Sequence, residues 1–141
     1  MCGLLGEFGK MQSPKSEFDS LLKLSENRGS DMIGYYNNLK GKKDETPFLQ
    51  FGFNRLSILD LSQDGQQPMY SKDRRYVITF NGEIYNFLEL RSLLESGGHK
   101  FYSKTDTEVL LAAWQKWGIG CVHKLKGMFS FVIDLNSCSK I

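Results

Sequence analysis

The sequence predicts an α+β domain in which strands lie toward both ends of the chain and a pair of helices lies between them. Short runs rich in apolar and β-branched residues precede residue 81 and return after residue 127, whereas residues 86–117 repeat their apolar positions at helical spacing. Strands, then helices, then strands again favour segregated layers over a parallel β-α-β wind. A length of 141 residues suits one domain, so we expect a single unit over residues 1–141.

The first half of the chain predicts three strands and one helix. Residues 3–8 are short, apolar and glycine-rich, which indicates a strand. Ser13 offers an N-cap to a helix expected over residues 14–25, with proline at its first position. Two further strands are expected over residues 33–39 and 47–54, joined by a polar loop in the manner of a hairpin.

The second half opens on a β-rich run at residues 75–80. The Asn81-Gly82 pair is expected to break this strand before residues 83–85 resume it. Asn-Gly is also the commonest two-residue turn of a β-hairpin, so a tight turn is the alternative interpretation of this pair. The apolar run at residues 128–135 predicts the last strand.

Two helices are expected between these strands, and each opens on a capping-box pattern. Asn86 with Glu89 three residues later begins the first helix, and Thr105 with Glu108 begins the second. Apolar residues recur at helical spacing in both, and glycines follow each of them.

Composition excludes several classes of function. The net charge of +2 is small and the basic residues are scattered, so we expect no nucleic-acid partner. No run approaches the roughly 18 apolar residues of a membrane helix, and the N-terminus lacks the pattern of a secretory signal. Three cysteines and two histidines suit neither a disulfide framework nor a zinc site, so we expect no metal and a reducing, cytoplasmic location.

Cys2 follows Met1 directly, and this position can carry chemistry. Removal of Met1 would give one residue both a thiol and a free α-amine. An α-amine with a pKa of about 8 can act as the base that activates its own thiol. The alternative is a buried cysteine at the start of a strand, since a free cysteine behaves as a small hydrophobe.

Further polar positions could serve such a thiolate. Attack on an amide carbon places negative charge on oxygen, which the Asn81 side-chain amide and the Gly82 N–H could stabilise. Arg55 could bind a carboxylate in bidentate fashion, although a solvated surface arginine is the alternative. Asp106 could hold an ammonium group, but the helix dipole alone also favours a carboxylate in the first turn of a helix.

Taken together, these residues and their order resemble the N-terminal-nucleophile (class II) glutamine amidotransferase domain, in the branch found at the front of glutamine-dependent asparagine synthetases. The most specific block is Asn81 to Asn86, particularly together with an N-terminal cysteine. The blocks that carry the resemblance follow the order of the family: Met1-Cys2-Gly3 with Gly6, Arg28-Gly29-Ser30-Asp31, Arg55-Leu56-Ser57-Ile58, Gln67-Pro68-Met69, Asn81-Gly82-Glu83-Ile84-Tyr85-Asn86, Thr105-Asp106-Thr107-Glu108 and Gly127-Met128-Phe129-Ser130-Phe131.

The resemblance implies an αββα sandwich, two antiparallel sheets between layers of helix, and a reaction. Cys2 would be the nucleophile, with its own amine as base and later as acid, while Asn81 and Gly82 would form the oxyanion hole. The side-chain amide of L-glutamine would be hydrolysed to glutamate and ammonia through a thioester. No metal or other cofactor is implied for this step, because ATP and Mg²⁺ would belong to a synthetase domain or chain that uses the ammonia.

The resemblance also implies a set of substrate-binding residues. Arg55 would bind the α-carboxylate of glutamine, and Glu83 and Asp106 would bind its α-amino group. Asn81 and Gly82 would contact the amide end of the substrate. Backbone groups of four consecutive residues would line the same pocket: Leu56, Ser57, Ile58 and Leu59.

Two departures from the family pattern affect what we expect. Ser30 stands where the family usually has proline, and we expect that change to be tolerated because serine is common in turns. The family domain continues through further strands after residue 135, so we expect a sandwich that is incomplete at its C-terminus and leaves a sheet edge uncovered. A weakly active glutamine-binding or regulatory module, a hydrolase of another amide, and an inactive remnant are the alternatives to a glutaminase.

Overall fold

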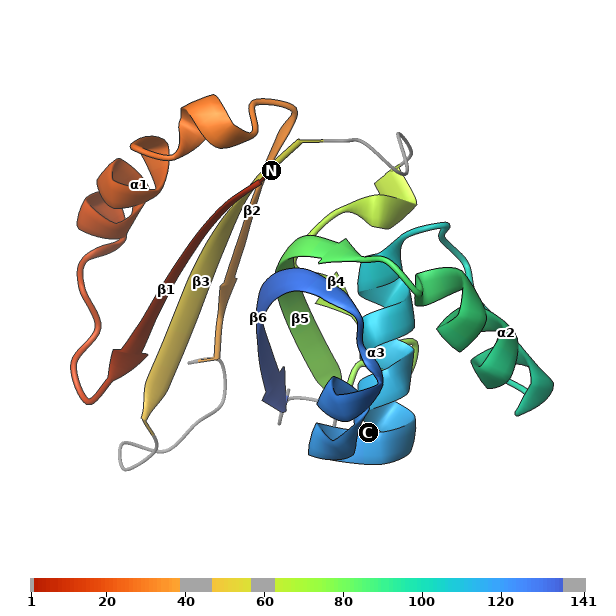
Figure 1. Ribbon diagram of the computed structural model, residues 1–141. Helices are drawn as coiled ribbons and strands as arrows, with labels where there is room; N and C mark the ends of the chain where they lie inside the picture. Colours follow the sequence, from red (N-terminus) through yellow and green to blue (C-terminus); the bar gives the residue numbers. More distant parts are fainter. Residues whose placement is uncertain (1, 39–46, 57–62, 136–141) are drawn as a thin grey trace.

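The computed structural model describes residues 2–38, 47–56 and 63–135, which form four layers (Figure 1). Two antiparallel sheets lie in the middle. Helix α1 (Lys15–Lys23) lies outside one sheet, and helices α2 (Phe87–Ser96) and α3 (Asp106–Trp117) lie outside the other. The predicted α+β class and αββα layering are therefore confirmed.

The first sheet has three strands in the order β1–β3–β2, namely β1 (Gly3–Gly9), β3 (Phe48–Arg55) and β2 (Met32–Asn37). Its register pairs Gly3 with Asn54, and Met32 with Arg55. The hairpin-like pairing of the second and third strands is confirmed. The start of β1 and the end of β3 consequently lie together at one end of the sandwich.

The second sheet has the order β4–β5–β6, namely β4 (Met69–Tyr70), β5 (Tyr76–Ile84) and β6 (Gly127–Leu135). Strand β5 runs unbroken through Asn81 and Gly82, which lie opposite Ser130 and Phe129. The expected break in this strand is therefore wrong, and so is the alternative of a hairpin turn. Pairing with β6 along the whole of β5 keeps this Asn-Gly pair extended despite its turn propensity.

Strand β5 divides its side chains between two cores. Val77 packs between the sheets with Phe51 and Tyr36, whereas Ile78 and Phe80 pack with the helices of the second sheet. Because successive side chains of a strand point to opposite faces, the odd-numbered positions of β5 face the first sheet.

Helix α1 starts one residue later than predicted, because Ser13 has another partner. The hydroxyl of Ser13 donates to Glu7 Oε1 at 2.7 Å, and Pro14 takes the position before the first helical residue without a capping side chain. The hydrogen bonds from Ser13 lower the pKa of Glu7, with a further contribution from Gln50. This loop is thus tied to β1 rather than to the helix that it begins.

The two predicted capping boxes have different outcomes. Thr105 caps α3, since its Oγ1 accepts a hydrogen bond from the Glu108 N–H at 3.2 Å. Asn86 does not cap α2; its side-chain amide instead donates to the Lys124 carbonyl and accepts from the Lys126 N–H, both at 2.9 Å. The amide of Asn86 therefore joins the start of α2 to the segment that leads into β6.

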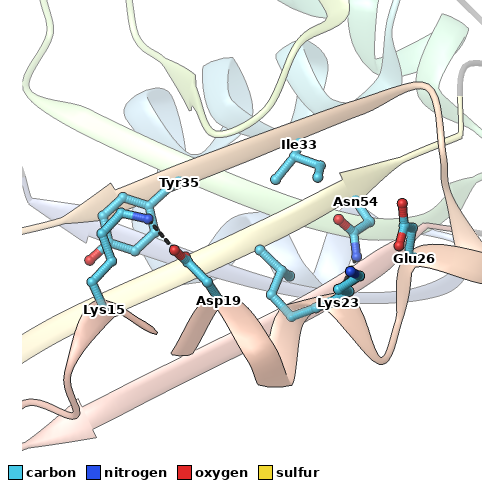
Figure 2. A pocket seen from close by; sticks show the side chains of 8 residues that line it. Lys15, Asp19, Lys23, Glu26, Ile33, Tyr35 and Asn54 are labelled. Carbon is cyan, nitrogen blue, oxygen red and sulfur yellow. Dashed lines mark hydrogen bonds and ion pairs between the residues drawn. The ribbon is translucent and has the colours of Figure 1, made fainter. Parts of the chain in front are cut away.

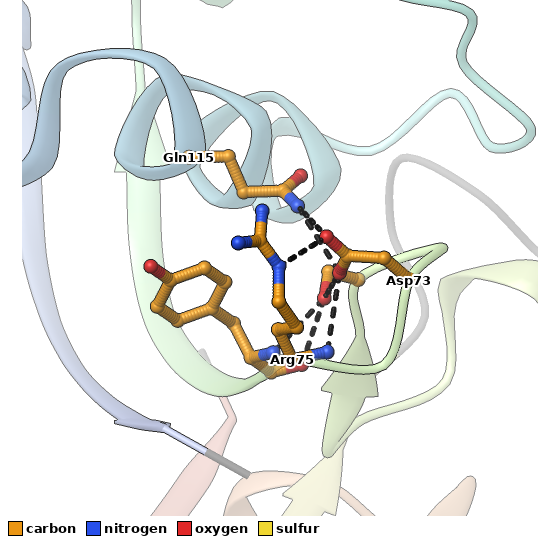
Figure 3. Close-up of polar contacts among 5 residues, drawn as sticks. Asp73, Arg75 and Gln115 are labelled. Atoms are coloured by element: carbon orange, nitrogen blue, oxygen red, sulfur yellow. Dashed lines mark hydrogen bonds and ion pairs between the residues drawn. The ribbon is translucent and has the colours of Figure 1, made fainter. Parts of the chain in front are cut away.

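The turn that joins β4 to β5 is attached to α3 by hydrogen bonds (Figure 3). The Asp73 carboxylate accepts hydrogen bonds from Ser71 Oγ and Arg75 Nε, both at 2.6 Å, and from Gln115 Nε2 at 3.3 Å. Partial burial raises the pKa of Asp73, but the hydrogen bonds from Ser71 and Arg75 outweigh that effect and lower it. These contacts fix the beginning of β5, at the end of the strand opposite to Asn81.

Candidate active site

Four of the predicted site residues point inward from the two sheets at one end of the sandwich, namely Cys2, Arg55, Asn81 and Glu83. Extending the β1–β3 register by one residue places Cys2 opposite Arg55. Arg55 shares its side of β3 with Phe51, which packs against Val77 between the sheets, so alternation turns both site side chains toward the second sheet. The N-terminus lies at the end of the sandwich where β5 leads toward α2 (Figure 1).

Cys2 is fixed at the end of β3 by hydrogen bonds. The Leu56 N–H donates to Cys2 Sγ at 3.3 Å, and the Sγ lies 3.7 Å from the Leu56 carbonyl oxygen. Arg28 Nε donates to the Cys2 carbonyl at 3.2 Å. Cys2 is only partly buried, so the interpretation as a buried core cysteine is wrong. A positioned, accessible thiol is what a nucleophile requires.

The Arg55 side chain is buried rather than solvated, with 5% of its surface exposed. Its Nη1 donates to Met32 Sδ at 3.5 Å. Gly65, in the short helix η2 (Gln63–Gly65), lies so close that an added Cβ would overlap the Arg55 guanidinium. Sequence reasoning did not identify Gly65, because an Asp-Gly pair in a polar segment predicts only a turn.

Asn81 and Gly82 lie on β5, and Asn81 faces the first sheet. The side chain of Asn81 shares a face with Val77, and its Oδ1 is buried without a hydrogen-bond partner among the described residues. Gly82 has a φ of 152°, and an added Cβ would overlap the Met128 carbonyl oxygen of β6. Only glycine fits this position without displacing the neighbouring strand.

The backbone N–H of Gly82 points away from β6. The Tyr85 N–H donates to the Lys126 carbonyl in the β5–β6 register, so the odd-numbered residues of β5 bond to β6. The even-numbered residues point to the other edge, where the Ile84 N–H donates to Asp106 Oδ2 at 3.1 Å. The Gly82 N–H therefore faces the edge of β5 that β6 does not cover.

Asp106 lies in the first turn of α3 with 5% of its surface exposed, and it contacts β5 directly. Burial raises the pKa of Asp106, the hydrogen bonds from the Ile84 and Thr107 N–H groups oppose that rise, and the charge of Glu83 adds to it. Glu83 is exposed and lies on the face of β5 that looks toward the first sheet. Two carboxylates are thus near the end of the sandwich where Cys2 lies.

Several predicted contacts are not shown by the described residues. Ser57, Ile58 and Leu59 fall outside the described ranges, and only Leu56 of that segment can be placed. Within residues 2–38, 47–56 and 63–135, no hydrogen bond joins Cys2 to Asn81 or Gly82. Cys2, the predicted nucleophile, lies beside the first sheet, whereas the predicted oxyanion donors Asn81 and Gly82 belong to the second, so the packing of the sheets controls their separation.

A pocket on the outer side of the first sheet is separate from these residues (Figure 2). Asn54 lines it and donates through Nδ2 to the Leu22 carbonyl of α1 at 2.8 Å, so Asn54 faces away from the second sheet. Lys15 and Asp19 form an exposed ion pair of 2.5 Å at its rim. Since Arg55 points to the opposite face of β3, this pocket is not part of the candidate site.

The described parts of the chain contain neither a membrane-spanning helix nor a cluster of metal-ligating side chains. None of the helices there is both long and apolar enough to cross a membrane. No group of three or more histidine, cysteine, aspartate or glutamate side chains is arranged there to hold a metal ion.

Known proteins are similar to this chain over most of its length. The chain is 41% identical over 138 residues to glutamine-hydrolyzing asparagine synthetase 1 of Bacillus subtilis, a match covering 94% of this chain and 20% of that protein. It is 35% identical over 136 residues to glutamine-hydrolyzing asparagine synthetase 1 of Arabidopsis thaliana, covering 94% and 21%. The chain therefore spans about a fifth of the length of these relatives.

A solved structure shares the fold. The glutamine phosphoribosylpyrophosphate amidotransferase of B. subtilis, complexed with ADP and GMP, superimposes with a TM-score of 0.53 at 24% identity, over 62% of this chain and 21% of that chain. The family model described as a glutamine amidotransferase domain matches residues 1–140, which is nearly the whole sequence. The chain therefore belongs to the glutamine amidotransferase domain family.

Proposed function

We propose that this domain hydrolyses the side-chain amide of L-glutamine, with Cys2 as the nucleophile. The observation that carries the proposal is the position of Cys2, held by the Leu56 N–H at 3.3 Å and opposite Arg55 on the sheet face that looks toward Asn81. A thiol, a carboxylate-binding guanidinium and an amide donor at one end of a sandwich are the groups that hydrolysis of glutamine requires.

The reaction begins once Met1 has been removed. The α-amine of Cys2 takes the thiol proton, and the sulfur attacks the side-chain carbonyl carbon of glutamine, forming a C–S bond and an oxyanion. The Gly82 N–H and the Asn81 amide stabilise that oxyanion. Collapse breaks the C–N bond, the α-ammonium returns its proton to the leaving ammonia, and water then hydrolyses the thioester to release glutamate.

Recognition of glutamine rests on its zwitterionic end. Arg55 binds the α-carboxylate, while Asp106 and Glu83 bind the α-ammonium, and the Leu56 backbone lies beside Cys2 at the same end of the sandwich. A substrate without that end would lack the charged groups that the buried Arg55 and Asp106 bind, and the loss of these interactions is a basis for its rejection. This argument favours a free amino acid over other amides as the substrate.

The ammonia would pass to a synthetase domain or chain, as the names of the relatives suggest. Formation of asparagine, with ATP and Mg²⁺ bound by that synthetase part, is the corresponding proposal for the whole protein. The glutaminase step itself needs no cofactor. A reducing, cytoplasmic location is included in the proposal, because a thiol nucleophile must stay reduced.

Glutamate release by the whole chain tests the proposal. Replacing Asn81 with Ala should lower kcat about 10²–10³-fold, because one oxyanion donor is lost. Arg55→Lys should chiefly raise KM for glutamine, because a lysine cannot form the bidentate contact. Asn37→Ala is the matched control, since Asn37 lies at the opposite end of the first sheet. A wild-type chain that releases no glutamate, or an Asn81→Ala chain as fast as the wild type, would contradict the proposal.

A further inference from the structure

We infer that Gln67 is a positioning residue that holds β5 beside the oxyanion donors. Its side-chain amide makes the two hydrogen bonds that the backbone of a neighbouring strand would otherwise make on the edge of β5 that β6 does not cover. The inference rests on the proposed function, because its consequence is a change in glutamine turnover.

The register of the second sheet shows what Gln67 replaces. Strand β4 pairs Met69 with Ile78, and continuing that register by two residues would bring Gln67 opposite Phe80. The backbone pairing of β4, however, begins only at Met69. Gln67 Nε2 instead donates to the Phe80 carbonyl at 3.1 Å, and its Oε1 accepts from the Phe80 N–H at 2.6 Å. One side-chain amide therefore satisfies both backbone groups of Phe80.

The same amide reaches helix α3 and is well shielded from water. Gln67 Nε2 also donates to Thr107 Oγ1 at 3.2 Å, and the residue is only 7% exposed. The backbone of Gln67 lies against the other sheet, since an added Cβ on Gly34 of β2 would overlap the Gln67 carbonyl. Gln67 thus connects the sheet that carries Arg55 with the strand that carries Asn81.

These contacts matter because of where they fall along β5. On the edge that β6 does not cover, the Phe80 N–H is bound by Gln67 and the Ile84 N–H is bound by Asp106. The Gly82 N–H points to the same edge, midway between them. The first turn of α3 supplies both Asp106 and the Thr107 hydroxyl that Gln67 contacts. Two buried side chains therefore fix the strand on each side of the proposed oxyanion donor.

The rate of the chemical step is sensitive to the position of the Gly82 N–H, whereas binding of the α-carboxylate and α-ammonium groups of glutamine is less sensitive to it. Oxyanion donors must lie within about 0.5 Å of the productive geometry, and a loosened strand loses that precision. Loss of the Gln67 amide leaves the Phe80 N–H and carbonyl without their partner in the interior. We therefore expect a variant at this position to lower kcat and to leave KM for glutamine nearly unchanged.

The test compares four variants of the full chain by their kcat and KM for glutamine hydrolysis, with thermal unfolding measured alongside. Gln67→Met should lower kcat about tenfold or more with KM within about twofold, as expected when an interaction made in the transition state is weakened. Gln50→Met is the matched control, because Gln50 is a fully buried glutamine bonded to Tyr35 and Gln12 away from the site. It should lower the melting temperature and leave kcat unchanged.

Thr107 provides an independent measurement if Gln67→Met does not fold. Thr107→Val keeps the shape but removes the acceptor of Gln67 Nε2, so kcat should fall several-fold, whereas Thr107→Ser keeps the hydroxyl and should retain the wild-type kcat. A folded Gln67→Met chain with wild-type kcat, or equal kcat for the two Thr107 variants, would overturn the inference. An inactive wild-type chain would overturn the proposed function itself, and this inference with it.

Discussion

Gly82 needs to lack a side chain for two physical reasons. Its φ of 152° is a backbone conformation that residues with a Cβ rarely adopt, and the space that a Cβ would fill is taken by the Met128 carbonyl and the Cα of Phe129. The same residue directs its N–H to the open edge of β5. Gly82 therefore packs closely against β6 on one side and presents its N–H as a hydrogen-bond donor on the other.

Gly82→Ala should therefore destabilise the fold by about 1–3 kcal/mol and abolish glutamine hydrolysis, because β6 must move to admit the methyl group. Gly6→Ala is the control, since an added Cβ at Gly6 in β1 meets nothing within 4 Å. Urea unfolding of the two variants gives the comparison. Equal stability of the two would show that β6 does not constrain Gly82.

At the residue scale, the sequence identified those residues whose type alone indicates the chemistry they can perform. Cys2 and Arg55 were found in this way, since a thiol near a free amine and a guanidinium each suggest a task. Gly65 and Gln67 were not assigned roles. Their importance depends on which distant segment approaches them, the Arg55 side chain in one case and the Phe80 backbone in the other, and no local pattern encodes that approach.

At the scale of elements, the start of α3 is the contact point between the helical layer and the candidate site. Asp106 in its first turn binds the Ile84 N–H of β5 while it is almost fully buried. Burial raises the pKa of Asp106, so the folded chain holds a proton there more tightly than the unfolded chain does. The ionised carboxylate therefore opposes folding at pH values above the raised pKa, and this cost disappears as the pH falls toward the ordinary value of 3.8.

Asp106→Asn should separate function from stability. The variant keeps an oxygen for the Ile84 N–H but loses the charge that would bind the ammonium of glutamine, so KM should rise strongly. Near neutral pH its melting temperature should equal or exceed that of the wild type, and the difference should shrink as the pH is lowered through the raised pKa. A variant that melts well below the wild type by the same margin at every pH would contradict this account.

Most elements could be predicted from local pattern, and the exceptions have identifiable causes. Turn propensity at Asn81-Gly82 suggested a break in β5, but pairing along the whole of β6 decided the conformation instead. Strand β4, with two residues, is too short to produce a period. Ser13 and Asn86 had the right side chains for helix caps, yet each hydrogen-bonds outside its helix, to Glu7 and to Lys124 respectively.

At the scale of the whole molecule, the proposed active site depends on the contact between the two sheets. Cys2 and Arg55 belong to one sheet, and Asn81 and Gly82 belong to the other. The α+β class followed from the order of strands and helices, and the αββα layering followed from the family resemblance. The facing of the site residues could not be derived before the register was known, because a shift of one residue reverses every side chain.

Phe51→Ala should weaken that contact and with it the reaction. Phe51 is fully buried between the sheets against Tyr36 and Val77, so its truncation should cost about 3–5 kcal/mol of stability. Phe8→Ala is the control, since Phe8 is 72% exposed in β1. Chemical unfolding and kcat are measured for both, under conditions in which each is folded. If Phe51→Ala keeps the wild-type kcat while folded, the site does not depend on the packing of the sheets.

The most direct test of the central claim is the mass of the chain after treatment with an electrophilic ketone analogue of glutamine, followed by peptide mapping. We predict that the chain has lost Met1 and carries one adduct, located on Cys2, and that excess glutamine slows its formation. Cys121 should remain unmodified, because it is fully buried and burial raises the pKa of its thiol. Retention of Met1, or an adduct on Cys121 or Cys138 with Cys2 unmodified, would contradict the account.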